Sequence, residues 1–197
     1  MCPAIYRPTN FTTMHKRVFV AILVLFIAGK TNTMRRCFPT RRPHRYSIKH
    51  FVNSSERIWT CRASLRTTIH CQFDIMRSIN PLAIFFNRTF LIRGQRYSMR
   101  LRGEFDPRHI DRMDISVPGM EAVSRETLIY DAPNLSCGVV QVQQLRRDAA
   151  CYYELRAKNS SIEGVIDREC WRHFHSVAHQ EIYVYRPECQ HRVRPRM

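Results

Sequence analysis

Residues 137–170, CGVVQVQQLRRDAACYYELRAKNSSIEGVIDREC, contain the pattern that decides the fold. Two segments rich in valine and tyrosine lie between Cys137 and Cys170, and the second holds the pair Glu154-Leu155. β-branched and aromatic residues favour strands, so these segments predict a pair of strands framed by cysteines. Cys189 follows near the end of the chain. The spacing suggests a barrel crosslinked by disulfides, and such a fold favours binding as the function.

Outward from this stretch, similar segments recur between Arg57 and Tyr185, separated by turn signals such as Asn80-Pro81 and Arg93-Gly94. Turns about 8 to 12 residues apart are typical of closed up-and-down barrels and of sandwiches. We expect an all-β fold built as an eight-stranded antiparallel up-and-down barrel. The predicted strands are 56–62, 69–79, 82–92, 95–101, 112–117, 127–131, 138–145 and 151–157.

Two helices and a last short strand are predicted around this sheet. Residues 46–52 have near-helical spacing and suggest a short helix before the first strand. Apolar residues recur at helical spacing from Ile162 to Phe174, so a second helix is expected to pack outside the barrel. Residues 182–185 are expected to return as a short strand.

The N-terminal region predicts export. Lys16-Arg17 precedes the apolar run 18–28, which is shorter than the roughly 20 residues that a membrane-spanning helix needs. Residues 1–33 are therefore predicted to be a cleaved signal peptide, with Met14 as its natural start and 1–13 as an upstream extension. Residues 34–55 are expected to form a basic segment with the short helix, and 56–197 the barrel with its outer helix and tail. No later apolar stretch is long enough for a membrane anchor, so the protein is expected to be secreted and extracellular. The region after the predicted signal peptide contains four acceptor motifs for N-glycosylation, at Asn53, Asn87, Asn134 and Asn159.

The charge of the chain is +16. Removing the four bases of the predicted signal peptide from the 32 in the chain leaves 28 against 16 acids, or +12. A charge this high attracts polyanions, although the arginines are spread along the chain. The local run at 35–45 is expected to be a solvated segment, with weak binding to sulfated glycans as the functional alternative. A polyanion-binding surface protein is thus one hypothesis, and no specific nucleic acid is expected.

Seven cysteines remain after the predicted signal peptide. None forms Cys-x-x-Cys, which argues against a zinc ribbon or a thioredoxin-type site, and disulfides are the default in an exported chain. Because seven is odd, at least one thiol is unpaired within the chain. Cys61 and Cys151 lie in the predicted first and last strands, which become neighbours when a barrel closes, so they could form a bridge. The alternative pairs Cys37 with Cys151 and leaves Cys61 free.

The fragments YSIKHFVNSSERIWT, CQFDI, FFNRTF, ETLIY, SCGVVQV, CYYELRAKNSSI, DREC and PEC, in this order, resemble the lipocalins of tick saliva, including the histamine-binding proteins. That family's signature is Cys-Asp, then Glu-Leu-Trp or Glu-Leu-Tyr, then Cys. Here Gly138 stands in place of the aspartate and Arg156 in place of the aromatic residue. The resemblance implies a lipocalin barrel with disulfides Cys137–Cys170 and Cys71–Cys189. It also implies a monomeric salivary protein that acts against host mediators.

Period-two alternation places Tyr152, Glu154 and Arg156 on one face of their strand, toward the cavity. In amine-binding members of the family this glutamate contacts the ligand, so the resemblance implies that Glu154 helps to sequester histamine or another biogenic amine. Arg156 could instead neutralise Glu154, or hold the carboxylate of a leukotriene or fatty acid. The candidate aromatic residues of the pocket, each with plain core packing as the alternative, are Trp59, Phe73, Phe86, Phe90 and Tyr130. The acids that could point inward are Asp74, Glu104, Asp114 and Glu126, of which most are expected at a solvated rim.

The motifs of the common enzyme classes are missing from the sequence. There is no Gly-x-Ser-x-Gly elbow and no Ser/His/Asp set in a recognisable context. His173 and His175 would point to opposite sides of a helix, which does not suit a metal site. We therefore expect a binding protein that is not an enzyme, with no metal and no cofactor.

Overall fold

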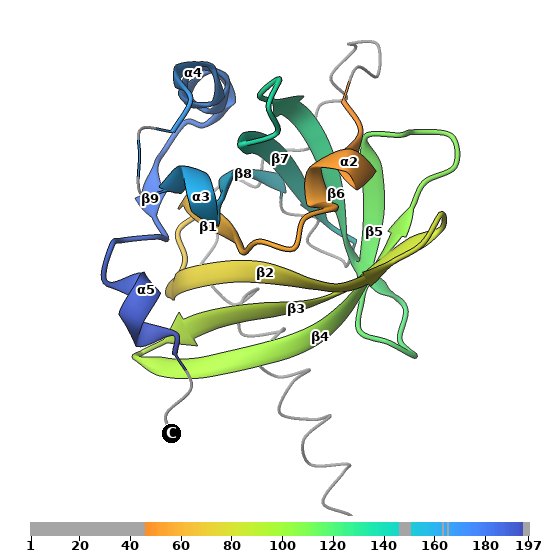
Figure 1. The fold of residues 1–197 in the computed structure, drawn as a ribbon, viewed down its shortest axis with the longest axis horizontal. Helices are drawn as coiled ribbons and strands as arrows, with labels where there is room; N and C mark the ends of the chain where they lie inside the picture. Colours follow the sequence, from red (N-terminus) through yellow and green to blue (C-terminus); the bar gives the residue numbers. More distant parts are fainter. Residues whose placement is uncertain (1–45, 146–150, 163, 165, 195–197) are drawn as a thin grey trace, which may run out of the picture. The chain divides into compact units, whose positions relative to one another are not determined.

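The computed structural model describes residues 46–145, 151–162, 164 and 166–194. Eight antiparallel strands form a closed barrel in which each strand pairs with the next, and β1 pairs with both β8 and β2 (Figure 1). This confirms the predicted fold class. The strands are β1 Ile58–Ala63, β2 Ile69–Ile79, β3 Ala83–Ile92, β4 Gln95–Phe105, β5 Arg112–Ser116, β6 Ala122–Asp131, β7 Cys137–Gln144 and β8 Cys151–Lys158.

Two strands are longer than predicted. β4 continues to Phe105 instead of ending at residue 101. Gly103 permits this, because a Cβ atom there would lie 2.9 Å from side-chain atoms of Ile84 and Met113. β6 begins at Ala122 instead of Thr127, and its first half pairs with β5. This half of the strand was not predicted because Ser124-Arg125-Glu126 is polar throughout. The inward position 126 is a carboxylate, where a strand usually has an apolar residue.

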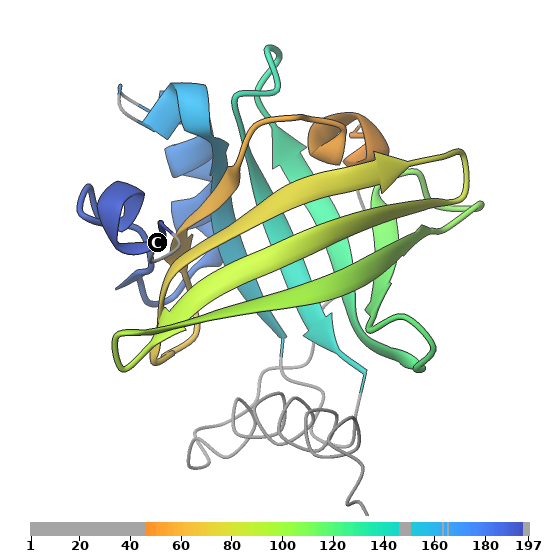
Figure 2. The ribbon, with the colours of Figure 1, turned by 60° about the horizontal axis from the view of Figure 1, so that its bottom comes forward.

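The short helix α2, Ile48–Val52, covers the end of the barrel beside β6 (Figures 1 and 2). The Ser47 side chain caps its first turn by accepting a hydrogen bond from the His50 backbone N–H. Its apolar side chains are buried, and the Ile48 N–H donates to the Ile110 carbonyl at 3.0 Å. The helix therefore closes this end with apolar groups.

The predicted outer helix is two helices. α3, Asn159–Ile162, follows β8 directly, and α4, Arg168–Val177, begins again after the cap residue Asp167, whose carboxylate accepts a hydrogen bond from the Glu169 N–H. α4 packs on the outer face of β7 and β8 through Cys170 and Phe174 (Figure 1). After it, β9 Ile182–Tyr183 pairs with β1, and α5 Cys189–Arg192 lies beside β2.

Two disulfides fasten these outer segments to the barrel. Cys137–Cys170 attaches α4 to β7, and Cys71–Cys189 attaches α5 to β2. Both pairs are the ones that the family resemblance implied. Each constrains the unfolded chain and adds about 2 to 4 kcal/mol of stability.

The predicted disulfide between Cys61 and Cys151 is wrong. Cys61 is a free, buried thiol, whereas Cys151 is disulfide-bonded. β1 and β8 are neighbours as predicted, but their register places Cys61 between the partners of Arg156 and Leu155. Cys151 lies four residues before Leu155 on β8. At 3.3 Å per residue this is a distance of about 13 Å from the level of Cys61, which is too far for a disulfide. The alternative partner Cys37 lies outside the described residues.

Within the described residues, no helix is both long enough and apolar enough to cross a membrane.

Candidate ligand-binding site

Five charged side chains meet inside the barrel, each from near the middle of its strand. Asp74 lies on β2, Arg88 on β3, Glu126 on β6, and Glu154 and Arg156 on β8. The predicted alternation on β8 is confirmed for its buried part, since Glu154 and Arg156 face inward and Leu155 packs outside against α4. Strand pairing places Asp74 directly opposite Arg88.

Arg156 bridges two carboxylates. Its Nη1 donates to Glu126 Oε2 at 2.6 Å, and its Nε donates to Glu154 Oε2 at 2.7 Å. The residue is only 2 % exposed. The hypothesis that Arg156 neutralises Glu154 is therefore confirmed.

Arg88 holds the other side of the cluster. Its Nε and Nη2 donate to the two oxygens of Asp74 at 2.8 and 2.7 Å, and Nη2 also donates to Glu126 Oε1 at 3.0 Å. Glu126 is fully buried and is shared by both guanidinium groups. It is therefore the centre of the network.

Neutral side chains provide further hydrogen bonds to Glu154. Thr60 Oγ1 donates to Glu154 Oε2 and Gln72 Nε2 donates to Glu154 Oε1, both at 3.4 Å. Gln72 also donates to Thr60 Oγ1 at 2.9 Å. Hydrogen bonds of this kind make a buried carboxylate tolerable.

Burial and the neighbouring charges shift the pKa values of several residues in and beside the cluster. Burial by itself would raise the pKa of Glu126, but the charges of Arg156 and Arg88 and their hydrogen bonds outweigh it and hold this pKa at about 2. For Arg156, burial would lower the pKa, but Glu126 and Glu154 raise it overall. Burial, followed by the charge of Glu154, raises the pKa of Tyr152. At neutral pH Glu126 and the two arginines are therefore charged, and Tyr152 is neutral.

The charges of this cluster do not balance. Among the described residues, three carboxylates face the interior and two guanidinium groups oppose them, which leaves one negative charge. The side chains of Arg88 and Asp74 retain 14 % and 16 % exposure, whereas those of Glu126 and Arg156 retain 0 % and 2 %. The Asp74–Arg88 side is therefore the more solvent-accessible part of the cluster.

Two of the aromatic candidates for the pocket, Trp59 and Tyr130, lie outside the interior, which corrects the prediction for them. Trp59 precedes the inward Thr60 and so faces outward, where its Nε1 donates to Asn159 Oδ1 at 2.9 Å. Tyr130 should share the inner face with Glu126 by alternation, but a register shift between Leu128 and Tyr130 turns it outward. There it stacks on His173 with ring centroids 3.9 Å apart.

Among the acids, Asp74 and Glu126 join the cluster and the other two do not. Glu104 pairs with Arg102 at 3.1 Å, and Asp114 pairs with Arg125 at 2.7 Å, in partly exposed ion pairs away from the interior. Sequence reasoning missed Arg88. The signal was its place in the run Ile84, Phe86, Arg88, Phe90, where alternation puts a base among buried apolar residues.

Gly138 explains the departure from the tick lipocalin signature. A Cβ atom at this position would lie 3.0 Å from the Tyr130 carbonyl oxygen and 3.1 Å from Cε2 of the Phe51 ring. Phe51 of α2 thus occupies the space that an aspartate side chain would need. The second carboxylate that the family pattern supplies is replaced here by an apolar plug.

The four predicted glycosylation sites differ in exposure. Asn53 and Asn134 are exposed, whereas Asn87 and Asn159 are half-buried. Asn159 Oδ1 also accepts hydrogen bonds from Trp59 and Gln190. Glycosylation at any of the four stays a prediction.

Comparisons with known proteins find similar folds and no similar sequences. No family model matches the chain, and no curated protein matches it. Japanin from Rhipicephalus appendiculatus, in a structure bound to cholesterol, superposes with a TM-score of 0.51 at 6 % identity, over 67 % of this chain and 93 % of that one. Lobster apocrustacyanin A1 has a TM-score of 0.51 at 8 % identity, over 70 % and 79 % of the two chains. Identities this low establish the fold alone.

Proposed function

We propose that this chain, whose barrel has the lipocalin fold, is a secreted binding protein that sequesters a small organic cation, of the biogenic amine class, in the barrel interior. Histamine is the ligand we favour. The observation that carries the proposal is the excess of one carboxylate over the guanidinium groups inside the barrel. The structure of Japanin with cholesterol supports the coarser statement that a barrel of this fold can hold a small molecule.

An unbalanced buried anion favours a cationic ligand on physical grounds. A carboxylate away from water is costly unless a positive charge accompanies it. A protonated amine beside Asp74 would bring the interior charge to zero. The aromatic ring of Phe86 lies 5.5 Å from the Arg88 guanidinium, and aromatic faces in such a site also attract cations.

The same contacts argue against an anionic lipid in the interior. Arg156 is held by Glu126 and Glu154, and Arg88 by Asp74 and Glu126. A fatty acid or leukotriene carboxylate would be a fourth anion against two cations. Within the described residues Arg156 Nη2 has no hydrogen-bond partner, but it lies 2.6 Å from Glu154 Oε2, whose charge would repel an incoming carboxylate.

The proposed amine position differs from the one that the family resemblance implies. In amine-binding members of that family, the ligand contacts the glutamate that corresponds to Glu154 and an aspartate at the position that corresponds to Gly138. Here Phe51 blocks the second place, and Glu154 already accepts from Arg156, Thr60 and Gln72. We therefore place the amine on the Asp74 side of the cluster.

Calorimetry with matched ligands tests this function. Histamine and serotonin are titrated into the purified protein beside imidazole-4-acetate and 5-hydroxyindole-3-acetate, which keep each ring and replace the amine by a carboxylate. We expect one amine to bind with 1:1 stoichiometry and neither acid to displace it. No heat and no competition with either amine at micromolar concentration, or displacement of the bound amine by an equal concentration of its matched acid, would refute the proposal.

Secretion and glycosylation complete the proposal and have their own test. Expression of the full chain in secretory cells should release the protein into the medium with an N-terminus between residues 29 and 34. Treatment with a glycosidase should then lower its mass. Protein retained in the cells with an intact N-terminus would contradict this part alone.

A further inference from the structure

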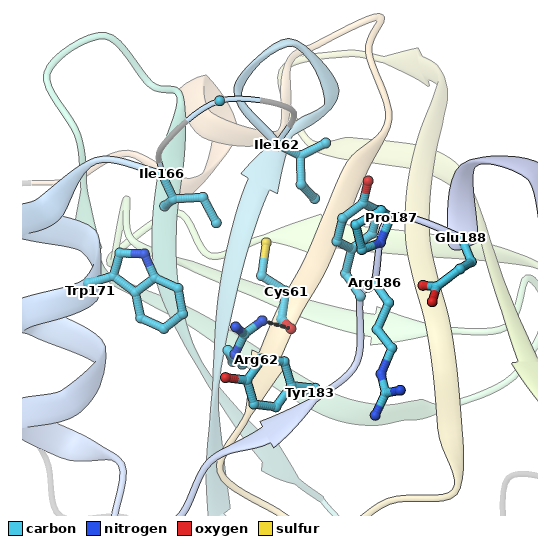
Figure 3. Close-up of a pocket in the computed structure, with 11 residues that line it drawn as sticks. Cys61, Arg62, Ile162, Ile166, Trp171, Tyr183, Arg186, Pro187 and Glu188 are labelled. Atoms are coloured by element: carbon cyan, nitrogen blue, oxygen red, sulfur yellow. Dashed lines mark hydrogen bonds between the residues drawn. The ribbon is translucent and has the colours of Figure 1, made fainter.

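A pocket with a volume of about 570 Å³ lies outside the barrel, between β1, α4 and the segment that follows β9 (Figure 3). Its volume falls within the range of roughly 300 to 1,000 Å³ that is typical of small-molecule sites. Most of its lining is apolar or aromatic, from Ile162, Ile166, Trp171, Tyr183, Tyr185 and Pro187. The pocket is separate from the charged cluster. On β1, Cys61 and Arg62 line the pocket outside the barrel, whereas Thr60 points into the barrel and contacts Glu154 of the cluster.

Both walls of this outer pocket are attached covalently to the barrel. Trp171 follows Cys170, which is bonded to Cys137 on β7, and Glu188 precedes Cys189, which is bonded to Cys71 on β2. The segment between them is also hydrogen-bonded to the barrel, since the N–H groups of Val184 and Tyr185 both donate to the Cys61 carbonyl. A pocket held in this way exists before the ligand arrives, which lowers the entropic cost of binding.

The floor of the outer pocket is uncharged. Figure 3 shows the Cys61 sulfur directed up between Ile162 and Ile166. Burial raises the pKa of this thiol to about 12, so it stays protonated and presents a small apolar surface at neutral pH. An acyl chain or an aromatic ring can therefore rest on it.

Two arginines give the outer pocket its polar character, and one of them is available. The Arg62 guanidinium lies over the Tyr183 ring at 3.5 Å and pairs with Glu181 at 2.6 Å. The exposed Arg186 guanidinium forms no ion pair or side-chain hydrogen bond within the described part of the chain. Glu188 also lines the pocket, but in Figure 3 it lies beyond Pro187, away from Cys61.

We infer that this outer pocket is a second binding site, for an amphipathic carboxylic acid with an acyl or aromatic body. The body lies on Trp171, Ile162 and Ile166, and the carboxylate binds Arg186 at the rim. Charge separates the two sites, because the interior has an excess negative charge and the outer pocket has an unpaired guanidinium. The inference does not depend on the proposed amine site.

Titration of the full chain with cis-parinaric acid, a fluorescent fatty acid, tests the inference. Arg186→Glu should weaken binding by about tenfold, the order expected when a charge-assisted hydrogen bond is lost. Arg168→Glu is the matched control, because it makes the same charge change at an exposed position of α4 that does not line the pocket. Asp74→Asn, in the barrel interior, should also leave the affinity for this acid unchanged.

A photoreactive diazirine derivative of palmitic acid then locates the site without any substitution. We expect crosslinks to peptides that contain Trp171 or Tyr183. Three results would each overturn the inference: no binding of either acid up to 100 μM, equal losses in the Arg186 and Arg168 variants, or crosslinks confined to inward residues such as Tyr152.

Discussion

Arg156→Met removes the charge of the bridging guanidinium and keeps most of its volume, so it isolates the electrostatic role of the interior cluster. Two carboxylates lose a partner, and removal of one member of a buried ion pair costs about 3 to 5 kcal/mol. Glu126 still accepts from Arg88, and Glu154 still accepts from Thr60 and Gln72. We therefore expect the lower end, a loss of about 3 kcal/mol in the free energy of unfolding at pH 7.

Urea unfolding followed by circular dichroism measures this loss. With a slope of about 2 kcal/mol per molar urea, the midpoint should fall by about 1.5 M. The matched control is Arg172→Met, in which the lost pair with Glu169 is on the surface and the arginine side chain is 64 % exposed. It should cost less than about 1 kcal/mol.

The effect of Arg156→Met should depend on pH with a defined sign. In the native protein the pKa of Glu126 is about 2, below its ordinary value of 4.5. This group therefore contributes stability that is complete above about pH 4.5 and is lost as the pH falls toward 2. Because the variant lacks much of this contribution, its deficit should be largest at pH 7 and should shrink between pH 5 and pH 3. A variant within 1 kcal/mol of the native protein at pH 7, or a deficit that grows on acidification, would refute the reasoning.

Three further predictions concern the frame around the cluster. Replacing Cys71 and Cys189 by serine should cost about 1 kcal/mol more than replacing Cys137 and Cys170, because the loops span 118 and 33 residues; equal losses in urea unfolding would contradict this. The thiol of Cys61 should be inert to a thiol reagent in the native protein and react once in denaturant, and fast labelling of the native protein would show that it is not buried. Gly138→Ala should lower the unfolding free energy by about 1 to 3 kcal/mol, since its Cβ would press on Phe51 and the Tyr130 backbone; a neutral effect would mean that α2 does not plug this end.

The parts of the fold that follow from local patterns could be predicted from the sequence. Turn residues and alternation located every strand, because each turn needs particular residues and each strand has one buried face. The Arg93-Gly94 turn is an example, since both residues have positive φ angles of 50° and 82° in a two-residue hairpin. Strand ends were less well predicted, because the limits of β4 and β6 depend on their pairing with β5, which residue patterns within each strand do not reveal.

The site could be predicted only in part, because it depends on register. Glu154 and Arg156 were found because they share one strand and one face. Tyr130 was misplaced because a bulge in β6 reverses the alternation, and a bulge has no reliable signal in a single sequence. Arg88 and Glu126 come from different strands, and their contact becomes apparent only when the barrel closes.

The most direct test of the central claim is histamine affinity across a series of interior charges. Among the described residues, the native cluster has a charge of −1, Asp74→Asn brings it to zero, and Arg88→Gln brings it to −2. Calorimetry on variants that retain native circular dichroism should show at least tenfold weaker binding for Asp74→Asn and no weakening for Arg88→Gln. If Asp74→Asn binds histamine as tightly as the native protein, or if both variants lose affinity equally, then the excess negative charge is not what recognises the ligand.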